Sequence, residues 1–286
     1  MVPTKILKPM LGFLKKILLI LIKIIAVPGI AVFCVWAAFQ IVGGEIILAY
    51  EGPGIAEWLR RVYLGFDFGQ AGDWAASGQA VAPYIWQAVA NTGTVTLLAV
   101  LLLTISSLVW TYQAWRYPYS RMTKSGSVIM RFFSSWPILI GAIFMAVLSR
   151  GQVFASVFLA ALVLAICDNN LNDFLDNLYE EIKSVLKSDY AIAVMGQGRS
   201  FIKNLGPELA WKILSFIATR LPVLVSGIII LELYFNINGI YKFLKMFYEA
   251  RDLNAILGIT FVVSLLMTSW NSLFTLIHAA IDPRQR

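Results

Sequence analysis

The longest apolar run of the chain, residues 17–42, is interrupted only by Lys23, Pro28 and Gln40. A run of this length is enough to cross the ~30 Å hydrocarbon core of a bilayer as a helix. It exceeds the apolar region of a secretory signal peptide and lacks a clear small-x-small cleavage site. We therefore predict an uncleaved first membrane span, preceded by a basic cytoplasmic segment over residues 1–16.

Five further apolar segments follow the first. They cover about residues 92–115, 132–149, 153–167, 213–231 and 254–281. The fourth is shorter than the ~20 residues that a span needs. Either it continues through the polar residues 168–173, or it is short and tilted. Pro137 is expected to kink or start the third span, and Gly206-Pro207 to mark a helix start, because proline is favoured at a first helical position.

The basic residues fix the expected orientation of these spans. Seventeen of the 23 lysines and arginines fall in segments that this arrangement assigns to the cytoplasm, as the positive-inside rule requires. With 59% hydrophobic and only 14% charged residues, we predict an all-α polytopic membrane protein with six transmembrane helices. Both termini are then cytoplasmic, and residues 17–286 form one transmembrane domain. Its long connections are an extracytoplasmic loop over 43–91 and a cytoplasmic loop over 173–206.

Several functional classes are disfavoured by what the sequence lacks. There is one histidine, His278, and there are two cysteines, Cys34 and Cys167, which disfavours metal centres and disulfide frameworks. No phosphate-binding glycine loop and no nucleophile elbow is present. The basic residues lie beside apolar runs and not along one face, so nucleic acid is not an expected partner. We expect no catalytic residue, metal site or cofactor in this chain.

A series of short motifs runs in order along the chain. Asp189-Tyr190-Ala191 precedes Gly198, and Gly206-Pro207 and Leu221-Pro222 come next. The series continues with Glu232, Phe235, Gly239, Arg251-Asp252 and Asp282-Pro283-Arg284; upstream lie Leu64-Gly-Phe-Asp-Phe-Gly69 and Trp136-Pro137. From about residue 60 to the end, this order and spacing resemble the permease subunits of binding-protein-dependent ABC importers, in particular the dipeptide/oligopeptide/nickel class.

The resemblance implies a six-span permease in a bacterial or archaeal inner membrane. It would pair with a second, homologous permease and take a small solute, such as a peptide or a nickel chelate, from an extracytoplasmic binding protein. Two ABC ATPase subunits would supply the energy by docking on the loop between spans four and five. The positions that correspond to this coupling loop are Asp189, Tyr190, Ala191, Ala193, Gly196, Gly198 and Arg199. Glu232, Phe235 and Gly239 correspond to family positions of the outer gate and loop.

The coupling loop also departs from the family pattern. The Ala-Arg-Ala-Lys run before the glycine is replaced by Val194-Met195-Gly196-Gln197, which removes two positive charges. The outer loops are short for the family. An alternative hypothesis is therefore a degenerate permease that serves as a membrane scaffold or assembly subunit of a larger complex.

Four polar residues are candidates for lining the pathway: Asp168, Asn169, Asn172 and Asn271. If the fourth span continues through residues 168–173, its acids would be costly in hydrocarbon and should face water or a basic partner. The other interpretation is a helix end at Cys167 followed by a solvated turn. For Asn271, a hydrogen bond between helices is the alternative.

Overall fold

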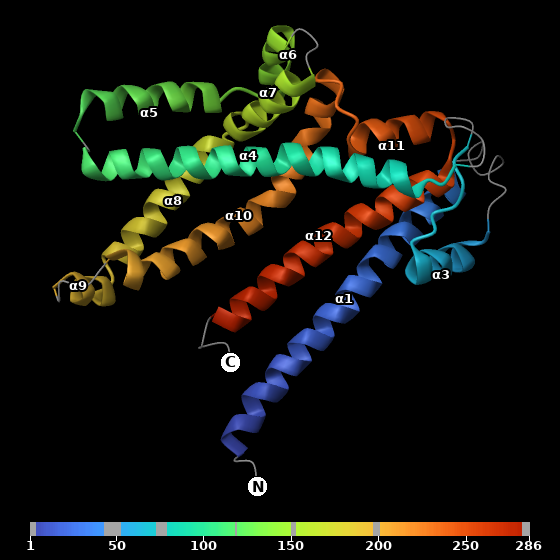
Figure 1. The fold of residues 1–286 in the computed structure, drawn as a ribbon, viewed down its shortest axis with the longest axis horizontal. Helices are drawn as coiled ribbons and strands as arrows, with labels where there is room; N and C mark the ends of the chain where they lie inside the picture. The colour runs from blue at the N-terminus through green and yellow to red at the C-terminus, as the bar shows by residue number, and fades with distance from the viewer. Residues whose placement is uncertain are drawn as a thin grey trace. The chain divides into compact units, whose positions relative to one another are not determined.

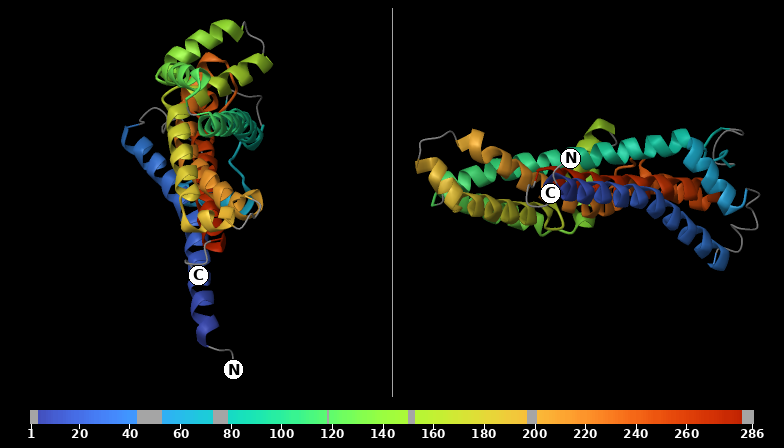
Figure 2. Two further views of the ribbon diagram at one scale, coloured as in Figure 1. Left: turned by 90° about the vertical axis from the view of Figure 1, so that its left-hand side faces the viewer. Right: turned by 90° about the horizontal axis from the view of Figure 1, so that it is seen from below.

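The computed structural model describes residues 4–42, 53–72, 79–117, 119–149, 153–196 and 201–281 (Figures 1 and 2). Within these ranges the chain is helical, with no strand and a single isolated bridge between Gln70 and Ala80. The predicted all-α class is confirmed. The chain divides into two compact units, one formed by Met1–Ala90 with Gly239–Arg286 and the other by Asn91–Asn238.

The first unit contains α1 (Thr4–Val42), α3 (Ile55–Gly65), the first turns of α4 (Ala82–Arg116), α11 (Ile240–Glu249) and α12 (Leu253–Ile281). The second unit contains the rest of α4, α5 (Arg121–Ser134), α6 (Ile138–Ser149), α7 (Val153–Ile166), α8 (Asn170–Leu186), α9 (Asp189–Gly196) and α10 (Phe201–Tyr234).

Four helices in the described ranges are long and apolar enough to cross a membrane. Their apolar portions are Leu14–Val42, Ala82–Ala114, Ala210–Tyr234 and Leu253–Ile277. Two bent pairs, α5 with α6 and α7 with α8, also pass this test when each pair is taken as one span. The chain therefore has between four and six spans by length and composition.

The third and fourth predicted spans differ from the expectation because neither is a single straight helix. The α5–α6 pair bends by 96° and the α7–α8 pair by 56°. Residues 132–134 belong to α5, and Pro137 precedes the first turn of α6, where Ile140 N–H donates to its carbonyl at 3.0 Å. Proline fits here because no intrahelical donor is needed at a helix start.

The predicted helix start at Gly206-Pro207 is wrong. Helix α10 begins at Phe201 and continues through both residues to Tyr234. A proline inside a helix removes one hydrogen bond and bends the axis without necessarily ending the helix. The segment predicted as a loop over 173–206 is accordingly helical over α8, α9 and the start of α10.

The core of the first unit forms where α12 meets α3, α11 and the start of α4, and α1 lies along α12 (Figure 1). Gly258 of α12 permits the closest of these approaches. A Cβ there would lie 2.7 Å from Ile85 Cδ1 and 3.1 Å from Phe68 Cδ1. Both neighbours are fully buried, so this contact leaves no room for a larger residue.

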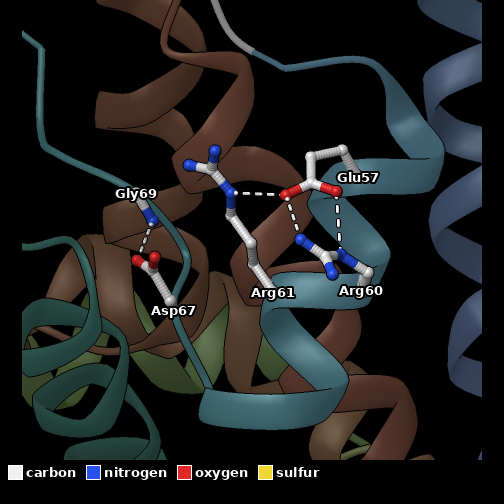
Figure 3. A network of polar contacts seen from close by, with 5 residues as sticks. All are labelled: Glu57, Arg60, Arg61, Asp67 and Gly69. Atoms are coloured by element: carbon white, nitrogen blue, oxygen red, sulfur yellow. Dashed lines mark hydrogen bonds and ion pairs between the residues drawn. The ribbon is translucent and has the colours of Figure 1, made fainter.

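The segment between α3 and α4 is held by its own turn residues. Phe66 ends α3 in the left-handed conformation, and Gly69 has φ of 88°. Asp67 Oδ1 accepts a hydrogen bond from Gly69 N–H at 3.0 Å, as Figure 3 shows. This turn directs Phe68 into the core, where it is 1% exposed. The Phe-Asp-Phe-Gly motif therefore has a structural role in the first unit.

Asp252 joins the same segment to the start of α12. Its Oδ1 accepts from Ala255 N–H at 3.0 Å, which caps the helix, and its Oδ2 accepts from Gly72 N–H at 2.8 Å. A carboxylate at a helix N-terminus is also favoured by the helix dipole. One side chain thus stabilises two distant parts of the sequence.

Helix α3 is amphipathic, with Trp58 and Val62 buried and a charged face outward. On that face Glu57 pairs with Arg60 at 2.9 Å and with Arg61 at 3.2 Å (Figure 3). Hydrogen bonds from the two guanidinium groups lower the pKa of the Glu57 carboxyl. All three groups are well exposed, so the pairs contribute little to stability.

We expect Gly258→Ala to lower the thermal stability of the detergent-solubilised protein. The added methyl group overlaps Ile85 and Phe68, and overpacking of this kind costs about 1–3 kcal/mol. Gly93→Ala in α4 is the matched control, because its Cβ would meet no described heavy atom within 4 Å. Equal melting temperatures for the two variants would contradict this packing.

Candidate functional site

Helix α9 is a short helix between α8 and α10 of the second unit (Figure 1). Its first turn is capped by Ser188, whose Oγ accepts from Ala191 N–H at 3.2 Å and whose carbonyl accepts from Ile192 N–H at 3.1 Å. Asp189 lies in the first turn, where the helix dipole favours a negative charge. The local sequence therefore defines where this helix starts.

One face of α9 is exposed along its whole length. Asp189, Ile192, Ala193 and Gly196 are all exposed, and their spacing of i, i+3, i+4 and i+7 places them on a single stripe. Ile192 is 58% exposed, and no described atom lies within 4 Å of a Cβ at Gly196. We call these four residues the α9 stripe. Its small residues allow another backbone to approach closely.

The opposite face of α9 anchors the helix. Ala191 is fully buried and packs in a small cluster with Val185 of α8. Ala191 was predicted among the coupling residues, but its burial removes it from the exposed face. Ile192 was not predicted, although its position three residues after Asp189 could have identified it.

Helices α8 and α10 are joined by contacts spread along their lengths. Asp173 pairs with Arg220 at 2.8 Å, and Glu181 pairs with Lys212 at 2.8 Å. Between these ion pairs, the rings of Phe174 and Phe216 meet edge to face with centroids 4.8 Å apart. The two helices that flank α9 in the chain are thus joined to each other, and each of them also contacts α9.

Two of the predicted coupling residues, Gly198 and Arg199, lie outside the described residues. Tyr190 lies in α9, but its side chain is also outside what the structure describes. The predicted set is therefore represented by Asp189, Ala193 and Gly196 on the stripe.

The predicted pathway residues Asp168, Asn169 and Asn172 lie at the break between α7 and α8. Asp168 and Asn169 both adopt left-handed backbone conformations, with φ of 55° and 58°. This conformation is tolerated best by Asn, Asp and Gly. The polar residues are therefore what allows the chain to turn after Cys167.

This break is hydrogen-bonded to the break between α5 and α6. Asp168 N–H donates to the Trp136 carbonyl at 3.0 Å, and Asn169 N–H donates to the Ser134 carbonyl at 2.7 Å. In return, Asp168 Oδ1 accepts from Ile138 N–H at 3.0 Å, which caps α6. We call this set the break lock. It gives Asp168 and Asn169 a structural role, and their pathway-lining role stays a prediction.

Asn172 contributes to the same region through its backbone, since its N–H donates to Ser134 Oγ at 3.3 Å. Asn271 lies in α12, in the other unit, and is exposed. Its carbonyl accepts from Thr275 Oγ1 at 2.8 Å within the helix. Three of the four predicted pathway residues therefore lie at the break lock, and Asn271 lies in the other unit.

The predicted outer positions are mostly buried. Glu232 is 0% exposed and accepts a hydrogen bond from Thr92 Oγ1 at 2.6 Å. Phe235 is 5% exposed in the core of the second unit. Gly239 precedes α11, and its carbonyl accepts from Phe243 N–H at 3.1 Å. Thr92, at the start of the second predicted span, is itself 3% exposed beside Glu232.

Among the described residues, no group of three or more histidine, cysteine, aspartate or glutamate side chains could hold a metal ion. The geometry offers instead a helix in contact with α8 and α10, whose exposed stripe combines Asp189 and Ile192 with the small residues Ala193 and Gly196. Such an arrangement is suited to contact with another protein.

Comparison with known families adds one finding. Residues 190–286 match the family described as "Binding-protein-dependent transport system inner membrane component". The match begins inside α9 and runs through α10, α11 and α12 to the last residue, about a third of the chain. No curated protein matches the sequence.

This match supports a permease of a binding-protein-dependent ABC transporter. Together with the helices of spanning length, it indicates a multi-pass membrane protein. Components of this kind work with ATPase and binding-protein partners and are in general not enzymes themselves.

We expect Asp168→Ala to destabilise the second unit by about 1–2 kcal/mol, because Ile138 N–H loses its cap. Asp168→Asn is the matched control: it retains an acceptor oxygen and tolerates the left-handed backbone. Thermal unfolding in detergent should rank the native chain and the asparagine variant close together, with the alanine variant clearly lower. An alanine variant as stable as the native chain would contradict the break lock.

Proposed function

We propose that the chain is the permease subunit of an ABC importer and that the α9 stripe is where an ATPase subunit docks. The observation that carries the proposal is the match beginning at Tyr190, within the helix whose exposed face is built from Asp189, Ile192, Ala193 and Gly196. A short helix in contact with α8 and α10 transmits the movement of a docked partner to them.

In this proposal the chain has six spans, with each bent pair counted as one, and both termini in the cytoplasm. A second, homologous permease completes the translocation pathway, and two ATPases supply the energy. An extracytoplasmic binding protein delivers the solute, which is a small peptide, a nickel chelate or a similar compound of the dipeptide/oligopeptide/nickel class. Alternating access follows from rocking of the two permeases against each other.

The sequence of α9 also favours a second candidate function. Asp189–Gly196 contains no lysine or arginine, so an acidic docking groove on an ATPase would find no positive charge on this helix. A chain that has lost coupling would serve as a membrane scaffold or assembly subunit. The two candidates differ in whether changes in the α9 stripe affect ATP hydrolysis.

We expect Ala193→Asp to reduce solute-stimulated ATP hydrolysis by the reconstituted complex at least tenfold, because a charged side chain would be buried unpaired against the partner. Hydrolysis should be measured with and without the loaded binding protein. Ser184→Asp is the matched control, since it adds the same charge at an exposed position of α8 away from the stripe.

The amount of assembled complex serves as a second readout. Normal assembly with lost hydrolysis in Ala193→Asp supports a coupled permease. Hydrolysis that is equal in the native chain and in both variants would contradict docking on the α9 stripe and favour the scaffold.

A further inference from the structure

A hollow of about 160 Å³ lies in the second unit between α4, α5 and α8. Its polar and aromatic lining includes Trp110, Thr111, Arg131, Asn172, Asp176 and Tyr179. None of these residues belongs to the α9 stripe. The hollow is therefore separate from the proposed coupling surface.

The hollow is shaped by a close approach of α5 to α4. A Cβ at Gly126 would lie 2.4 Å from Cη2 of the Trp110 indole, so only glycine lets α5 lie against this ring. On the other side, the hydrogen bond between Asn172 N–H and Ser134 Oγ ties α8 to the end of α5. The walls are thus set by the fold and not by mobile side chains alone.

Two opposite charges face this hollow without pairing. Arg131 of α5 and Asp176 of α8 both line it, and neither side chain has an ion-pair or hydrogen-bond partner among the described residues. A guanidinium and a carboxylate that do not neutralise each other can each take the opposite charge of a ligand. The complementary ligand carries one anion and one cation.

The rest of the lining agrees with a small polar ligand. Thr111 is 4% exposed, and its hydroxyl has no hydrogen-bond partner among the described residues. A buried hydroxyl of this kind is costly unless something pairs with it. Trp110 and Tyr179 supply aromatic walls. Aromatic faces attract ammonium groups; the Tyr179 ring already has Lys183 Nζ 5.6 Å from its centroid, so the Trp110 ring is the wall left for a ligand ammonium.

The surroundings of the hollow point to lipid as the source of that ligand. Helices α4 and α5 carry exposed apolar side chains next to the lining residues, among them Val109, Tyr112, Val128, Ile129 and Phe132. Such side chains suit contact with acyl chains, while Arg121 and Lys124 at the start of α5 suit an interface with lipid phosphates. A headgroup in the hollow and its tails on these helices would use both features.

We propose that this hollow binds a zwitterion with an ammonium group and a phosphate, supplied as the headgroup of an ethanolamine phospholipid. Arg131 takes the phosphate, and Asp176 takes the ammonium beside the Trp110 ring. The assignment concerns a lipid site and does not depend on the direction of transport or on coupling.

The test is native mass spectrometry of the full chain released from nanodiscs that contain phosphatidylethanolamine and phosphatidylglycerol in equal amounts. We expect retained phosphatidylethanolamine on the native chain and about tenfold less on Arg131→Gln and on Asp176→Asn, as the loss of one charged hydrogen bond implies. Lys187→Gln at the end of α8 and Glu180→Gln on α8 are the control variants, since both residues lie outside the lining, and they should retain the lipid as the native chain does.

Two outcomes overturn the proposal. Equal retention by all five proteins would mean an adventitious annular lipid only, and equal retention of phosphatidylglycerol would mean a simple anion site.

A further arm distinguishes the sources of the zwitterion. Displacement of the lipid by millimolar phosphoethanolamine would identify a free solute as sufficient, whereas resistance to it would assign the site to the intact lipid; either result keeps the charge assignment.

Discussion

The main physical constraint on this chain is that hydrocarbon offers no partner for a backbone N–H or C=O group. Long helices such as α1 and α12 satisfy it internally. The two bent pairs do not, because each break exposes the ends of two helices. The break lock joins the two breaks by hydrogen bonds. The carbonyls of Trp136 and Ser134 accept from the N–H groups of Asp168 and Asn169, and Ile138 N–H donates to Asp168 Oδ1. The arrangement of the second unit depends on this exchange.

The helices of the second unit pack closely on both sides of the breaks that the break lock joins. Helix α6 packs on α7 closely enough that a Cβ at Gly141 would lie 2.6 Å from Cys167 Sγ. Beyond the break, α8 leaves at an angle and is paired with α10 through Asp173–Arg220 and Glu181–Lys212. The α9 stripe therefore sits at the end of a set of helices that contact one another as far as the breaks. This connection is what the proposed coupling requires.

Much of the fold follows from the sequence, because apolar runs and turn residues act locally. The helical class was predicted correctly, and four long apolar helices cover the first, second, fifth and sixth predicted spans, although α4 begins at Ala82 and not near residue 92. Pro137 precedes a helix, as predicted. The angle of the breaks could not be predicted, since it depends on Asp168 and Asn169 meeting residues some thirty positions earlier. The prediction at Pro207 was wrong because it used only the local preference of proline for a helix start. In the structure α10 begins at Phe201 and continues through Pro207.

The candidate site was predictable in position but not in orientation. The motif beginning at Asp189 located α9, whereas the choice between Ala191 and Ile192 as the exposed residue required knowing which face meets Val185. The polar residues 168–172 were recognised as unusual for an apolar segment. Their hydrogen bonds in the break lock could not be predicted from the sequence. Asparagine and aspartate are common both in left-handed turns and in the lining of a pathway, so the residue types do not distinguish the two roles. The hollow between α4, α5 and α8 joins residues that no local pattern connects.

A coupled permease is recognised by the chains with which it is assembled. The tagged protein should be extracted from its native membrane in a mild detergent, and the chains that remain bound should be identified. For a coupled permease we expect a second multi-span permease together with ATPases that carry a P-loop. Recovery of a different stable membrane complex, with neither of these partners, would contradict this function.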